Sequence, residues 1–118
     1  MLTLYLYPRC TTCQKAQKWL NERGVSYSMI DIKKDHPDAE TIERIQEKCG
    51  FPLKRLFNTS GMLYRQLNLS EKLKNMSESD QLDLLGSDGM LVKRPLLIGE
   101  DFALVGFREK EWEAKLNA

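Results

Sequence analysis

The most constraining feature of this sequence is a Cys-x-x-Cys pair between a strand pattern and a helix pattern near the N-terminus. Residues 2–7 alternate aliphatic side chains with other strand-favouring ones, which predicts a half-buried strand. Residues 11–14, Thr-Thr-Cys-Gln, match a capping box and predict a helix that begins at about Cys13 and ends at Gly24. Residues 25–32 predict a second strand. Two strands that flank one helix form a βαβ unit with parallel pairing, so the sequence predicts an α/β fold.

A second helix is predicted between a proline and a glycine. Pro37 suits a first helical position, and Gly50 suits the position just after a helix end. Ile42, Ile45 and Cys49 fall on one face of this helix, so Cys49 is interpreted as a packing residue.

The second half of the chain predicts a helical insertion and then a hairpin. Short helical signals run through about residues 53–88. Residues 96–98 and 102–107 predict two antiparallel strands, and Trp112 and Leu116 lie on a final helix. The expected order is βαβ, helical insertion, ββα. It gives a single mixed sheet flanked by helices, in one domain that spans residues 1–118.

Charge and cysteine content exclude several function classes. Eighteen basic and seventeen acidic residues leave a formal net charge of +1, which disfavours direct nucleic-acid binding. We expect no membrane span and no leader sequence, hence a cytoplasmic protein, and we expect a monomer. Three cysteines fit poorly with a secreted disulfide scaffold, so any disulfide is expected to take part in chemistry.

The Cys10–Cys13 pair is the strongest candidate site. A helix N-terminus directs unpaired backbone N–H groups and the positive end of its dipole at a nearby sulfur, and it stabilises a thiolate there. Thiolate is the nucleophile of thiol chemistry, so Cys10 is the expected attacking residue and Cys13 the resolving one. The alternatives are half of a zinc site or two ordinary cysteines. Zinc needs four ligands, and only Cys49 and His36 remain, at no familiar spacing, so no metal is expected.

Arg94 and Pro95 form the second candidate. A proline that opens a strand opposite a Cys-x-x-Cys is where folds of this type place a cis peptide bond beside the sulfurs. Arg94 would then direct a fixed cation at a thiolate or a bound oxyanion. The alternative, an arginine solvated at the start of a strand, is equally compatible with the sequence.

Three motifs give this chain a family resemblance that spans nearly its whole length. The sequence resembles the arsenate reductase-like (ArsC/Spx/MgsR) branch of the thioredoxin fold, which includes glutaredoxin-linked arsenate reductases and the redox-controlled transcription regulator Spx. The motifs that carry the resemblance are Tyr7-Pro8-x-Cys10-Thr-Thr-Cys13-x-Lys15-Ala16, Lys93-Arg94-Pro95-Leu96 and Leu104-Val105-Gly106-Phe107.

On the arsenate reductase side, the resemblance implies one catalytic cysteine at Cys10 and three arginines that hold arsenate. One of these arginines falls on Arg94, and the other two positions hold Asn58 and Gly106. Neither Asn58 nor Gly106 can supply a positive charge, and each charge-assisted contact to arsenate is worth ~1.5–3 kcal/mol. We therefore do not expect an efficient arsenate reductase.

On the Spx side, the resemblance implies a Cys-x-x-Cys redox switch and a protein that binds the C-terminal domain of the RNA polymerase α subunit. Gly50 matches the glycine at that contact. The sequence therefore predicts a thiol–disulfide redox protein with Cys10, Cys13, Arg94 and Pro95 at its site. No bound cofactor is expected, and the implied partners are glutathione, a thioredoxin- or glutaredoxin-type reductant, or a protein disulfide. The alternative is a redox-sensing regulator that binds the polymerase subunit.

Overall fold

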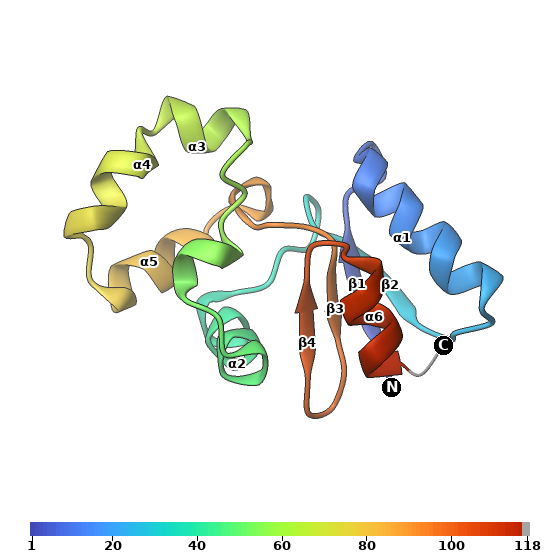
Figure 1. The fold of residues 1–118 in the computed structure, drawn as a ribbon. Coiled ribbons are helices and arrows are strands. Elements are labelled where there is room, and N and C mark those ends of the chain that lie inside the picture. Colours follow the sequence, from blue (N-terminus) through green and yellow to red (C-terminus); the bar gives the residue numbers. More distant parts are fainter. Residues whose placement is uncertain (117–118) are drawn as a thin grey trace.

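The computed structural model describes residues 1–116 and contains one mixed four-stranded sheet (Figure 1). The strands are β1 (Thr3–Leu6), β2 (Ser28–Asp31), β3 (Leu96–Ile98) and β4 (Ala103–Val105), in the order β2-β1-β3-β4. β1 pairs in parallel with β2, with Thr3 opposite Ser28, as the βαβ pattern predicts. β3 is antiparallel to both β1 and β4. The predicted α/β architecture of the thioredoxin-like type is therefore confirmed.

Helices cover both faces of this sheet. The helical elements are α1 (Thr11–Glu22), α2 (Ala39–Cys49), η1 (Leu53–Leu56), α3 (Met62–Gln66), α4 (Leu69–Lys72), η2 (Leu73–Asn75), α5 (Glu78–Leu85), η3 (Gly89–Leu91) and α6 (Glu109–Leu116). Figure 1 shows α1 and α6 on one side of the sheet, and α2 with the helical insertion on the other. Within residues 1–116, no helix is both long and apolar enough to cross a bilayer.

Strand alternation divides the core into two clusters. Leu97 and Leu104 pack in the cluster under α1 and α6, which also contains Trp112. Their neighbours along the chain, Leu96 and Val105, pack in the cluster under α2 and the insertion. Successive side chains of a strand point to opposite faces of the sheet, so β3 and β4 are buried on both sides. The helix α1 packs on one face of this sheet and α2 packs on the other.

The ends of two helices differ from the sequence predictions. The structure begins α1 at Thr11 with Cys10 as its N-cap, so the predicted capping box around Thr11 is wrong. The Gln14 side chain instead donates to the carbonyl oxygen of Pro8 at 2.8 Å. Pro37 precedes the N-cap of α2, because Asp38 takes that place and accepts from the backbone N–H of Thr41 at 2.8 Å.

Gly89 fixes the segment that leads into β3. A Cβ atom there would overlap the carbonyl oxygen of Ile32, so only glycine lets η3 approach the end of β2 this closely. The backbone N–H of Lys93 then donates to the carbonyl oxygen of Leu56 at 2.7 Å. These contacts set the position of the residues just before Pro95.

Replacing Gly89 by alanine should therefore destabilise the protein strongly. We expect Gly89→Ala to lower the free energy of unfolding by about 3 kcal/mol, at the upper end of overpacking costs. Gly50→Ala is the control, because a Cβ there meets nothing within 4 Å and only its φ of 70° disfavours a side chain, at about 1 kcal/mol. Urea denaturation measures both, and equal losses would contradict the close packing of η3 on Ile32.

Candidate active site at Cys10

Cys10 lies between β1 and α1, with its sulfur at the first turn of the helix. Its backbone is extended, with φ −83° and ψ 120°, and its side chain accepts no capping hydrogen bond. The backbone N–H groups of Thr12 and Cys13 nevertheless lie close enough to the Cys10 sulfur to lower the pKa of its thiol. These groups have no partner within the helix, so a thiolate at Cys10 supplies one.

Several effects compete to set the pKa of Cys10. Partial burial is the largest of them and raises the pKa. Hydrogen bonds from the backbone and side chain of Cys13, the charge of Arg94 and the backbone N–H of Thr12 all lower it. Together they outweigh burial, so the pKa of Cys10 lies below that of an ordinary thiol and the nucleophilic form is favoured.

Cys13 has the opposite environment one helical turn further on. Its side chain is 1% exposed and packs with Ala16 and Leu20 in the cluster under α1. Burial and the neighbouring Cys10 sulfur together raise the pKa of Cys13 to about 12, although the backbone N–H of Tyr7, whose nitrogen lies 3.5 Å from the Cys13 sulfur, opposes the shift. Cys13 is therefore protonated near neutral pH.

Arg94 lies near Cys10, in the segment before β3, and lines the same cavity. The Arg94–Pro95 peptide bond is cis, as predicted. The Arg94 guanidinium lies 5.3 Å from the centre of the Tyr7 ring, and its Nη1 donates weakly to the carbonyl oxygens of Met90 at 3.4 Å and Val92 at 3.5 Å. Within residues 1–116, its buried Nε has no partner. The alternative of an arginine fully solvated at a strand start is therefore wrong, because Arg94 is half-buried beside Cys10.

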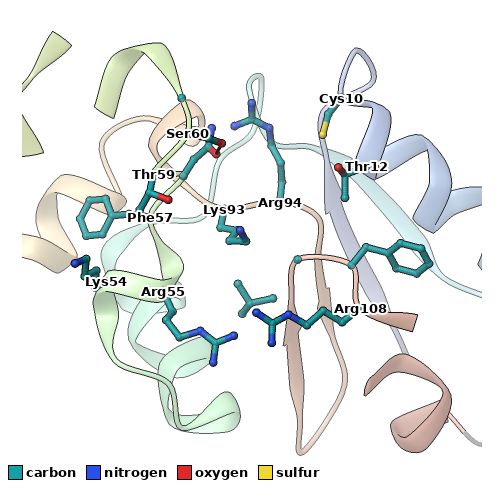
Figure 2. Close-up of a pocket in the computed structure, with 15 residues that line it drawn as sticks. Cys10, Thr12, Lys54, Arg55, Phe57, Thr59, Ser60, Lys93, Arg94 and Arg108 are labelled. Carbon is teal, nitrogen blue, oxygen red and sulfur yellow. Dashed lines mark hydrogen bonds between the residues drawn. The ribbon is translucent and has the colours of Figure 1, made fainter. Parts of the chain in front are cut away.

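A cavity of about 600 Å³ opens beside Cys10 (Figure 2). Four segments build it: the start of α1, the stretch from η1 to Gly61, the segment before β3 and the turn after β4. Asn58 and Gly106, the two positions where the family arginines were expected, both line it. Arg55 and Arg108, which were not predicted as site residues, also line the cavity, three residues before Asn58 and two residues after Gly106. An alignment to the family motif that allowed offsets of two or three residues would have pointed to both arginines.

Two residues considered in the sequence lie away from this cavity. Cys49 ends α2, where it packs partly buried against the cluster under the insertion, as the packing interpretation expected. Gly50 caps the same helix in the left-handed conformation and is exposed. Neither lines the cavity beside Cys10. Among residues 1–116, the candidate site therefore gathers Cys10, Arg94 and, beneath the surface, Cys13.

The sequence of this chain matches the pattern of a known protein family. The ArsC family pattern matches residues 5–115, which is nearly the whole chain. The chain belongs to the ArsC family.

Relatives of this ArsC-family protein include both regulators and proteins without a stated role. An uncharacterized protein of Bacillus subtilis (strain 168), YusI, is 53% identical over 112 residues, with 95% of each chain covered. The global transcriptional regulator Spx of Enterococcus faecalis is 31% identical over 94% of this chain and 83% of its own length. A solved structure of a Bacteroides fragilis protein related to the ArsC family superposes with a TM-score of 0.94, at 46% identity over 96% and 95% of the two chains.

The opposite environments of the two thiols predict selective alkylation. Cys10 should react first with iodoacetamide near neutral pH, because its lowered pKa provides thiolate, whereas Cys13, with a pKa of about 12, stays protonated. Arg94→Gln should raise the pKa of Cys10, because it removes a nearby positive charge.

Alkylation rates measured against pH and read by mass spectrometry give this pKa. Lys110→Gln, a change at an exposed residue of α6, is the control and should leave the pKa of Cys10 unchanged. A Cys10 that titrates like a free thiol in the unmodified protein would contradict the described site.

Proposed function

We propose that this protein carries out thiol–disulfide exchange, with Cys10 as the nucleophile and Cys13 as the resolving thiol. The single observation that supports this most is the contrast between two neighbouring sulfurs: Cys10 borders an open cavity that Arg94 also lines, whereas Cys13 is buried, and their pKa values shift in opposite directions. The Cys10 sulfur is available as a thiolate for the first attack, whereas the Cys13 thiol stays protonated until the second step. The open cavity beside Cys10 gives a substrate access to the attacking sulfur.

The proposed reaction has two steps. The Cys10 thiolate attacks one sulfur of a substrate disulfide, the substrate S–S bond breaks, and the first substrate thiol leaves and takes up a proton. Cys13 then loses its proton and attacks the Cys10 sulfur, which releases the second substrate thiol and forms the Cys10–Cys13 disulfide. Two electrons pass from the protein to the substrate. Arg94 stabilises the anionic form of Cys10 before the attack and after its reduction.

The cycle requires a reductant that returns the pair to two thiols. Glutathione or a thioredoxin- or glutaredoxin-type protein is the proposed source of these electrons, and a small disulfide or a protein disulfide is the proposed substrate.

Arsenate is a weaker candidate for the substrate. Arg55 and Arg108 approach the part of the cavity away from Cys10 in Figure 2, so they do not replace the charges missing at Asn58 and Gly106.

We accordingly expect little or no arsenate reduction when glutathione and glutaredoxin are supplied. Of the three positions that hold arsenate in the reductases that the chain resembles, only Arg94 is charged here. Consumption of NADPH in a coupled assay measures turnover, with a known arsenate reductase as the positive control. Turnover comparable to that control would show that the remaining cations suffice.

Replacing the resolving thiol should trap the intermediate. In a Cys49→Ser background, glutathione disulfide should convert the protein to the Cys10–Cys13 disulfide, which intact mass shows as a loss of two hydrogens. Cys13→Ser should stop at a glutathione adduct on Cys10, because no second thiol is within reach to release it. Cys10→Ser is the control and should give neither product. Formation of the same adduct at equal yield with Cys13 intact would contradict the resolving role.

A redox-sensing regulator is the second candidate, and two observations favour it. The Spx relative matches over 94% of this chain, and Gly50 is exposed with open space around its Cα. Such a protein needs only to change its surface when Cys10 and Cys13 join, without turnover. Its proposed partner is the C-terminal domain of the RNA polymerase α subunit, with Gly50 at the contact.

The regulator candidate predicts direct binding of that purified domain. Gly50→Arg should weaken binding about tenfold or more, because a bulky charged side chain would block close backbone approach. Gly24→Arg is the matched control, since Gly24 also has a positive φ and open space but ends a different helix. Isothermal titration with the oxidised and reduced protein measures both effects. Binding that is absent at high micromolar concentration would exclude this candidate.

A further inference from the structure

The charged side chains that line the cavity beside Cys10 are basic. Among the described residues, its lining includes no aspartate or glutamate and five basic side chains, Lys54, Arg55, Lys93, Arg94 and Arg108. This concentration of charge is local, because the whole chain carries a formal net charge of only +1. A cleft lined by one sign of charge attracts ligands of the opposite sign and increases their association rate.

Little of this positive charge is neutralised by neighbouring side chains. Arg108 lies 3.6 Å from Glu111, a pair exposed to solvent and therefore weak. Within residues 1–116, no ion pair involves the other four cations. Arg55 stacks 3.8 Å from the centre of the Phe51 ring, which positions its guanidinium without cancelling its charge. The buried Nε of Arg94 also has no partner there.

These cations form two groups along the cavity. Figure 2 shows Arg94 at the end next to Cys10, whereas Arg55 and Arg108 point toward one another at the other end, with Lys93 between the two groups. Two guanidinium groups that face each other favour an anion between them, because each can donate two parallel hydrogen bonds to a carboxylate. A ligand that meets both groups needs one anionic group near its sulfur and another several bonds away.

We propose that the cavity selects small disulfides that carry at least two carboxylates, and that Arg55 and Arg108 form the subsite for the carboxylate remote from the sulfur. This inference rests on the proposed thiol–disulfide exchange and names its substrate class. A volume of about 600 Å³ is in the range of small-molecule sites and exceeds what a lone oxyanion needs. Attack by Cys10, cleavage of the substrate S–S bond and release of one acidic thiol follow the two steps given above.

The test compares small disulfides that differ in charge. In a Cys49→Ser background, glutathione disulfide carries carboxylates, hydroxyethyl disulfide is neutral and cystamine is cationic. We expect Cys10 to react with glutathione disulfide about tenfold faster than with cystamine after correction for intrinsic disulfide reactivity, and to lose this preference at high salt. The double change Arg55→Gln with Arg108→Gln should remove most of the preference and leave the hydroxyethyl disulfide rate within about twofold.

The matched control is Arg65→Gln with Lys72→Gln. Both residues are exposed in the insertion and outside the cavity lining, so this variant loses the same charge but should keep the preference. Equal loss in both double variants would overturn the subsite and leave only a general charge effect. Equal corrected rates for all three disulfides would overturn charge selection while supporting exchange chemistry.

A binding measurement separates the subsite from the thiol chemistry. Cys10→Ser cannot carry out exchange, but it should bind S-methylglutathione, which has no reactive sulfur, and the Arg55 and Arg108 changes should weaken that binding about tenfold. Binding in this variant together with an inert Cys10 in the intact protein would overturn the proposed function and keep the acidic ligand site. No binding at millimolar concentration would overturn the subsite.

Discussion

The unpaired backbone N–H groups of the first turn of α1, which lie beside the Cys10 sulfur, are the feature on which the site depends. They lie there because Cys10, and not Thr11, is the N-cap, and those of Thr12 and Cys13 lower the pKa of its thiol. A helix start supplies these donors whatever the side chains are, but α1 must be held rigidly for them to act on one atom. Burial of Trp19 and Leu20 under the sheet provides that rigidity.

The sheet also brings the second half of the site to the first. β1 leads to Cys10, and β3, which lies beside it, begins just after Arg94 and Pro95, so strand pairing sets an arginine next to a cysteine more than eighty residues away in the chain. β3 is buried on both faces and β1 buries Leu4 and Leu6 on one face, so a shift of one residue in this pairing would move buried side chains from one cluster to the other and is disfavoured. The same sheet carries Arg108 after β4 toward the cavity.

The two cysteines show how one local arrangement produces two different environments. Cys10 and Cys13 differ by one helical turn, yet one sulfur opens on a cationic cavity and the other lies in an apolar cluster. Desolvation dominates at Cys13, whereas hydrogen bonds and Arg94 prevail at Cys10. The proposed nucleophile and resolving thiol therefore need no additional residue to distinguish them.

Local sequence patterns were enough to predict the α/β order, the placement of Cys10 near a helix start and the position of Arg94 before Pro95. These features follow from local patterns: alternation over 2–7, the Cys-x-x-Cys spacing and a proline before an apolar strand. The sequence did not determine the N-cap of α1, because Thr11 is the preferred N-cap type, yet the structure has an extended Cys10 in that place and Gln14 donates to Pro8 instead. Nor did it reveal that Arg55 and Arg108 line one cavity. They belong to segments far apart in the chain, and only the packing of the insertion and the pairing of β3 with β4 brings such charges together.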